Sequence, residues 1–116
     1  MNLTRFADAQ AYFPPNHDGM HCLRLQGHDA GPSDTVWLGV SHILPGGGTT
    51  LDASAVEKFY VVLEGSVTVV TAQGEETLAP HDSCRLAPGE KRALKNRSNR
   101  PATVLLVMPY PVAAAK

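Results

Sequence analysis

Glycine and proline recur at short intervals along this chain, and no other feature restricts its possible folds as strongly. Ten glycines and nine prolines are spread over 116 residues, with clusters at Pro14–Pro15, Gly31–Pro32, Pro45–Gly48 and Pro88–Gly89. The segments between the clusters are short and rich in valine, leucine, isoleucine and threonine. Because short β-prone segments separated by turn residues are typical of sandwiches and barrels, the sequence predicts an all-β protein.

The length and composition are those of one globular domain, which we expect to span residues 1–116, with 43% hydrophobic and 18% charged residues. We expect a short helix and an edge strand within residues 1–35, the helix over Leu3–Phe13, and a barrel core over residues 36–108. The turn Glu64-Gly65 predicts a hairpin between the strands on either side of it. The predicted strands are Met20–Gln26, Val36–Leu44, Phe59–Leu63, Ser66–Ala72, Ser83–Leu86, Lys91–Leu94 and Ala102–Met108.

Charge and targeting patterns exclude several classes of function. A net charge of −1 provides no global field for nucleic acid, so we expect no nucleic-acid partner. No apolar run approaches the ~20 residues of a membrane span, and the start of the chain lacks the basic and apolar regions of a signal peptide. Two cysteines are too few for a disulfide framework. These observations predict a cytoplasmic protein without a membrane partner.

Two regular spacings occupy the middle of the chain. In the first, Gly46, Asp52, Ser54, Lys58 and Gly65 are separated by five, one, three and six residues. In the second, five residues separate His81 from Ala87-Pro88-Gly89, two more precede Arg92, and three precede Asn96.

These two spacings resemble the two sequence motifs of the cupin family, over about residues 36–108. Gly46, Gly65, Gly89 and Asn96 match residues of the family motifs, and the segment Phe59–Gly65 resembles the family's sequence at that place. The resemblance implies a double-sheet jelly-roll β-barrel.

The metal-ligand positions of the cupin motifs are changed here. The resemblance implies three histidines and one glutamate around a divalent ion, but the aligned residues are Asp52, Ser54, Lys58 and Arg92. The side chains of lysine and arginine are cationic donors that do not coordinate a metal at neutral pH. We therefore expect no metal at this position and no cofactor, and we do not expect a metal-dependent dioxygenase. A different metal site, built from His42, His21 and a cysteine, stays open.

Alternation and the family analogy together direct Lys58, Tyr60 and Arg92 into the barrel. Two buried cations need a neutralising partner. One hypothesis is an internal salt bridge, in which Asp52, with Glu57 as a further candidate, pairs with Lys58 and Arg92 and plugs the barrel. The other is a pocket in which Arg92 and Lys58, with Ser54 nearby, bind a small organic anion of the carboxylate type.

Other residues are candidates for proton transfer. The residues of Val36–Leu44 alternate between two faces of the predicted strand. The face that contains His42 is the more uniformly apolar, so we expect His42 to face the barrel interior. His42, Tyr60 and Asp52 are then the candidate catalytic residues. Between Arg85 and Arg100 there are six basic residues and one acid, which are either a solvated surface or an anion-attracting wall.

Three functions stay open on this evidence. The first is a metal-independent enzyme of isomerase or lyase type, in which Lys58 and Arg92 hold a carboxylate. The second is a non-catalytic module that binds a small molecule. The third is a structural or interaction protein with a plugged barrel. The family resemblance also implies a homodimer.

Overall fold

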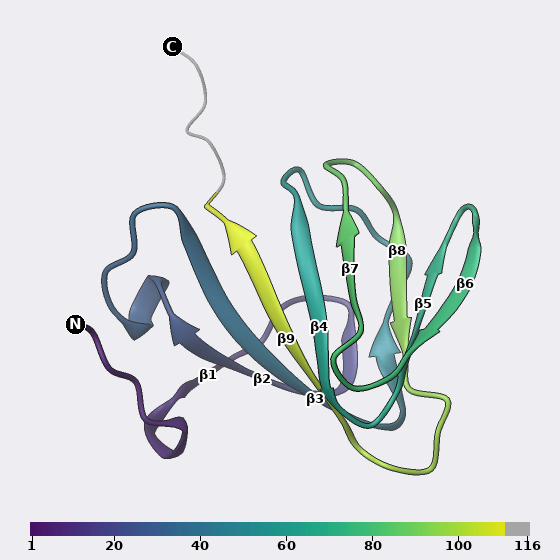
Figure 1. Ribbon diagram of the computed structural model, residues 1–116, viewed down its shortest axis with the longest axis horizontal. Helices are drawn as coiled ribbons and strands as arrows, with labels where there is room; N and C mark the ends of the chain where they lie inside the picture. Colours follow the sequence, from purple (N-terminus) through teal and green to yellow (C-terminus); the bar gives the residue numbers. More distant parts are fainter. Residues whose placement is uncertain (111–116) are drawn as a thin grey trace.

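The computed structural model describes residues 1–110, and the last six residues of the predicted domain, 111–116, lie outside this description. In Figure 1 the strands spread apart at one end of the molecule and converge at the other. The strands are β1 (Gln10–Tyr12), β2 (His17–Gln26), β3 (Val36–Thr49), β4 (Lys58–Glu64), β5 (Val67–Thr71), β6 (Gly74–Leu78), β7 (Ser83–Leu86), β8 (Arg92–Lys95) and β9 (Ala102–Pro109). The helical segments are the 3₁₀ turns η1 (Phe6–Asp8) and η2 (His28–Ala30).

The strands form one strongly curled sheet, which makes a nearly closed barrel. The order is β6-β5-β8-β3-β9-β4-β7, and β2 and then β1 extend it from β3. All pairings are antiparallel. The predicted all-β jelly-roll fold is therefore confirmed.

The long strand β3 belongs to both sides of the barrel. Its first part pairs with β2 and β9, and Gly48 near its end pairs with Lys95 of β8. A Cβ atom at Gly48 would lie 2.0 Å from the carbonyl oxygen of Leu94. Only a residue without a side chain allows β3 to pass this close to β8.

Most predicted strands are present within a few residues, but three local predictions are wrong. The predicted helix Leu3–Phe13 contains only the turn η1, followed by strand β1. Strand β6 was not predicted because its sequence, Gly-Glu-Glu-Thr-Leu, is mostly charged or polar. The Glu64-Gly65 turn is not a hairpin, since β4 pairs with β7 and β9 while β5 pairs with β6 and β8. The turn instead carries the chain across the barrel.

The core lies between the two sides of the barrel. Its most deeply buried side chains include Ile43, Val62, Val67 and Val104. On β3, the set that faces this core contains Trp37 and Ile43. Among residues 1–110, no helix is long and apolar enough to cross a membrane.

Candidate functional site

A cavity of about 300 Å³ opens at the mouth of the barrel, between β1 and β2 on one side and β4 and β8 on the other. Its walls are apolar and aromatic, with five basic or imidazole side chains among them. No aspartate or glutamate of residues 1–110 lines it. The lining residues that matter below are His17, Arg24, Trp37, Lys58, Tyr60 and Arg92.

Lys58, the first residue of β4, is 7% exposed. Its ammonium lies 6.0 Å from the centroid of the Tyr60 ring. It forms no ion pair with a carboxylate of residues 1–110. Burial, followed by the charge of Arg92, lowers the pKa of Lys58 to about 8, and Asp52 opposes this shift. The ammonium is thus a desolvated cation at a cavity wall, without a carboxylate partner in the described chain.

Arg92 begins β8 and is also 7% exposed. Its Nε donates to the hydroxyl of Tyr60 at 2.9 Å, and Nη1 donates to the backbone oxygen of Asp52 at 3.4 Å. Burial raises the pKa of Tyr60, so its hydroxyl stays protonated at neutral pH. The prediction that Lys58, Tyr60 and Arg92 meet inside the barrel is confirmed.

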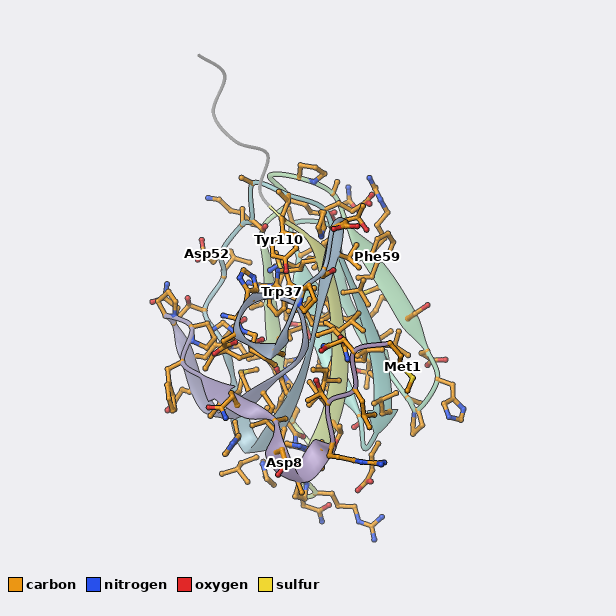
Figure 2. The ribbon with its side chains drawn as sticks, turned by 90° about the vertical axis from the view of Figure 1, so that its left-hand side faces the viewer. Met1, Asp8, Trp37, Asp52, Phe59 and Tyr110 are labelled. Atoms are coloured by element: carbon orange, nitrogen blue, oxygen red, sulfur yellow. The ribbon has the colours of Figure 1, made fainter. Side chains whose placement is uncertain are left out.

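The internal salt bridge is not formed. Asp52 is exposed, and its carboxylate accepts a hydrogen bond from the backbone nitrogen of Ala53 at 2.8 Å. Figure 2 shows Asp52 at the margin of the molecule, away from Trp37. Glu57 pairs instead with Arg85 on the surface. Asp52 contacts Arg92 only through the Asp52 backbone, so the hypothesis of an internal salt bridge that plugs the barrel is wrong.

Ser54 and His42 also lie outside the cavity lining. The hydroxyl of Ser54 accepts from the backbone nitrogen of Val56 at 3.1 Å and caps the loop before β4. His42 is half-buried on the outer side of β3, where its Nδ1 lies 3.2 Å from the Thr103 hydroxyl and its ring packs on Phe6.

The predicted orientation of His42 is wrong because both faces of β3 carry apolar residues. The curl of the sheet directs Trp37 and Ser41 inward instead. His42 pairs with His21 across the strands, whereas the neighbouring pair Cys22 and Ser41 lies on the opposite face. The alternative metal site from His42, His21 and a cysteine is therefore not assembled, and residues 1–110 contain no cluster of three histidine, cysteine or acidic side chains placed to bind a metal.

Sequence reasoning missed three basic or imidazole residues of the cavity: Arg24, His17 and His28. Arg24 lies in β2, and its guanidinium carbon is 4.1 Å from the centroid of Tyr12 and 4.8 Å from that of Trp37. His17 begins β2, and its Nδ1 donates to the backbone oxygen of Pro15 at 2.7 Å. The alternation of Met20, Cys22 and Arg24 was the available signal for Arg24; no spacing pointed to His17.

The comparisons with known proteins agree with this architecture. The model of the cupin domain matches residues 39–108. The chain belongs to the cupin family. Cupins of the usual type carry a metal at the barrel mouth, but the donor set here does not fit one. Buried Lys58 and Arg92 fill two of the four ligand positions as cations, while Asp52 and Ser54 are turned to local backbone groups.

One curated relative is named β-D-galactosidase Rv1717, from Mycobacterium tuberculosis. It is 42% identical over 114 residues, which is 97% of this cupin and 97% of the relative. Among solved structures, the polyketide cyclase RemF from Streptomyces resistomycificus has a TM-score of 0.84 at 23% identity, covering 100% of this chain and 88% of that one. A sugar phosphate isomerase from Silicibacter pomeroyi has a TM-score of 0.77 at 25% identity, covering 92% and 74%.

Proposed function

We propose that this cupin binds a small organic anion of the carboxylate type at the barrel mouth, with Lys58 as a point charge and Arg92 as a directional donor. The observation that carries the proposal is the buried ammonium of Lys58, which lines a cavity and has no carboxylate partner in residues 1–110. Burying an unpaired charge is unfavourable by several kcal/mol. An anionic ligand would remove that penalty.

The electrostatics of the cavity support the same proposal. Burial, and after it the charge of Arg92, lowers the pKa of Lys58, so both the desolvation of the ammonium and its repulsion by Arg92 would be relieved by an anion. The Nε of Arg92 donates a hydrogen bond to Tyr60, and its Nη1 donates a long one to the backbone of Asp52. Its Nη2 forms no hydrogen bond with a described residue. A carboxylate between Arg92 and Lys58 would accept charge-assisted hydrogen bonds from both side chains.

The relatives suggest a sugar-like or sugar-phosphate-like ligand, and the cavity is compatible with its anionic forms. Trp37 offers an indole wall. Hydrolysis of a glycoside usually needs a pair of carboxyl groups, and none lines the cavity within residues 1–110. We therefore favour binding of an acid over hydrolysis of a neutral galactoside.

The test compares galacturonate with galactose, since the two differ at one carbon, where the acid has a carboxylate. Isothermal titration calorimetry would be run on the wild type, on Lys58→Met and on Lys91→Met. Lys91 is an exposed lysine outside this cavity, so its variant controls for the loss of one positive charge. A set of shorter carboxylates and phosphates would be titrated in parallel.

We expect at least one acid of the set to bind, galactose to bind far more weakly than galacturonate, and Lys58→Met to lose acid binding by on the order of a hundredfold. Lys91→Met should bind as the wild type does. Binding that survives in Lys58→Met, or no binding of any anion, would refute the proposal. Hydrolysis of a nitrophenyl galactoside by the wild type would favour a glycosidase instead.

A second candidate function is proton transfer on the bound acid, as in an isomerase or lyase, and His17 favours it. A carbonyl oxygen only accepts, so the contact with Pro15 makes Nδ1 of His17 the donor and leaves Nε2 as the free nitrogen. Burial, together with the charges of Arg92 and Lys58, lowers the pKa of His17, against the contact with Pro15. A neutral imidazole with one free lone pair is a suitable general base, and the protonated Tyr60 hydroxyl can donate a hydrogen bond to negative charge that develops on the bound acid.

Hydrogen–deuterium exchange at the carbon next to the carboxylate tests this second function. The bound acid would be followed by NMR in D₂O at saturating concentration. We expect exchange in the wild type and a loss of about a hundredfold in His17→Gln. His42→Gln is the matched control, because His42 lies on the outer face. Binding without exchange in the wild type would favour a non-catalytic binding protein.

We also propose that the chain forms a homodimer, as the family resemblance implies. Several apolar side chains on the outer face of the barrel, Val36, Phe59 and Leu63, are exposed in the single chain. Size-exclusion chromatography with light scattering would give twice the mass of 12.4 kDa. A mass of one chain at all concentrations would refute the homodimer.

A further inference from the structure

Arg24 lines the same cavity as Lys58 and Arg92 but comes from a different strand, β2. In the sheet, Arg24 of β2 pairs with Gly39 of β3, Gly39 pairs with Leu106 of β9, and Leu106 pairs with Tyr60 of β4. Neighbouring strands are about 4.8 Å apart, so three steps separate Arg24 from Tyr60 by roughly 14 Å along the curved sheet. Because Tyr60 accepts a hydrogen bond from Arg92, Arg24 and Arg92 reach the cavity from separate strands rather than as one cluster.

The guanidinium of Arg24 is held in place by aromatic rings, and no acidic side chain of residues 1–110 pairs with it. It lies 4.1 Å from the centroid of Tyr12 and 4.8 Å from that of Trp37, and these two rings meet edge to face at 5.7 Å. Its Nε and Nη1 are enclosed and have no hydrogen-bond partner in the described chain. Nη2 is neither in this enclosed set nor hydrogen-bonded to a described residue, so it is the nitrogen that a ligand can reach.

A glycine makes room for this arrangement. A Cβ atom at Gly39, the residue paired with Arg24, would lie 2.8 Å from the Tyr12 hydroxyl and 3.0 Å from the Trp37 ring. The absence of a side chain at this position therefore allows both rings to pack beside Arg24. Ring contacts orient a cation without neutralising it, so the charge of Arg24 remains available to the cavity.

The charges in the cavity therefore form two groups. Lys58 and Arg92 lie beside Tyr60, and Arg24 lies beside Trp37, three strands along the curved sheet from Tyr60. No acidic side chain of residues 1–110 lines the space between them. A single carboxylate on Lys58 and Arg92 would leave the charge of Arg24 without a partner.

We propose that the natural ligand carries two separated anionic groups, one bound by Lys58 and Arg92 and the other by Arg24. This inference rests on the proposed function and adds a second point of attachment to it. The class includes short dicarboxylates and acids that also carry a phosphate group. A cavity of about 300 Å³ holds a ligand of this size.

The test uses dicarboxylates from malonate to adipate, each paired with its monomethyl ester. The ester has the same carbon chain and one charge fewer, so the ratio of the two affinities isolates the second anionic group. The affinities would be measured by calorimetry for the wild type, Arg24→Met, Arg24→Lys and Arg85→Met. Arg85 is exposed and paired with Glu57, so its variant controls for the loss of one arginine charge.

For the best chain length we expect the wild type to bind the diacid at least about tenfold more tightly than the ester. Arg24→Met should reduce this ratio to near one, Arg24→Lys should restore part of it, and Arg85→Met should leave it unchanged. Circular dichroism and thermal unfolding would confirm that each variant is folded. If Arg24→Met is unfolded, the ratio in Arg24→Lys decides, and a ratio equal to that of the wild type would overturn the proposal.

The experiments distinguish a failure of the proposed anion-binding function from a failure of the second attachment point at Arg24. If diacids and esters bind equally well and Lys58→Met abolishes both, the anion pocket stands and the second attachment point is overturned. A preference for the diacid that persists in a folded Arg24→Met also overturns it. If neither acids nor esters bind at all, the proposed anion-binding function itself has failed.

Discussion

Basic side chains inside the barrel mouth and on its outer surface have opposite surroundings. On the surface, Arg85 pairs with Glu57 and Arg97 pairs with Glu75, and both arginine side chains are 54% exposed. In the cavity, Lys58 and Arg92 are each 7% exposed. Neither forms an ion pair with a carboxylate of the described residues.

This difference is the reverse of what stability alone would favour. An exposed ion pair contributes little, because water already solvates both charges. A buried cation without a partner is unfavourable, and an apolar residue of similar size is often better for folding. The unpaired cations therefore lie where they reduce stability most, which is typical of a binding site rather than of a structural core. The predictions below test this contrast.

The largest effect is expected for Lys58→Met. Removing the buried ammonium should stabilise the ligand-free protein by about 1–3 kcal/mol while abolishing anion binding. Urea unfolding and calorimetry on the same preparation would measure both quantities. A folded variant that is less stable than the wild type would indicate that Lys58 has a structural partner. The difference between the cavity cations and the surface cations would then no longer hold.

The second effect is a dependence of stability on pH. The pKa of Lys58 is 10.5 in its ordinary state and about 8 in the fold. Between these values the unfolded chain holds more protons, so the free energy of unfolding of the ligand-free protein should rise with pH. The slope is at most about 1.4 kcal/mol per pH unit from pH 8 towards pH 10.

Urea unfolding at several pH values would measure this slope, and Lys58→Met should remove it. Protonation of Lys58 also favours the bound anion, so the affinity for an acid should fall as pH rises through about 8. A slope that is the same in the wild type and in Lys58→Met would assign it to other groups.

A moderate effect is expected for Gly39→Ala. The added Cβ would crowd the Tyr12 hydroxyl and the Trp37 ring, and both rings would have to move away from Arg24. We expect a loss of about 1–2 kcal/mol in stability and a smaller preference for diacids over their esters. Gly74→Ala is a poor control because its φ is 129°; Ala55→Gly, at an exposed loop position, is preferable. If Gly39→Ala leaves the preference for diacids unchanged, Gly39 is not needed to position Arg24 in the cavity.

The smallest effect is expected at the outer surface. Glu57→Gln removes the partner of exposed Arg85, and we expect a change in stability below about 0.5 kcal/mol. Anion affinity should also be unchanged, since Glu57 does not line the cavity. Thermal unfolding and calorimetry would check this, and a large loss of either would show that the surface pairs support the site.

Two groups of residues show how much of the fold and of the site could be predicted from the sequence. The cupin resemblance implied that Lys58 and Arg92 point into the barrel, and alternation along the strand added Tyr60; the structure brings the three together. The same reasoning failed on β3. Both faces of that strand are apolar, so periodicity could not tell which side contained His42.

The sequence by itself determined the all-β class, most of the strands, and the replacement of the cupin metal ligands by Lys58 and Arg92. These are local properties: turn residues, alternation and spacing act within a few residues of each other. The tertiary structure alone decided that Asp52 and Glu57 turn away, and that His17 and Arg24 reach the cavity. Those outcomes depend on how the sheet curls and which strands become neighbours, and long-range packing sets both.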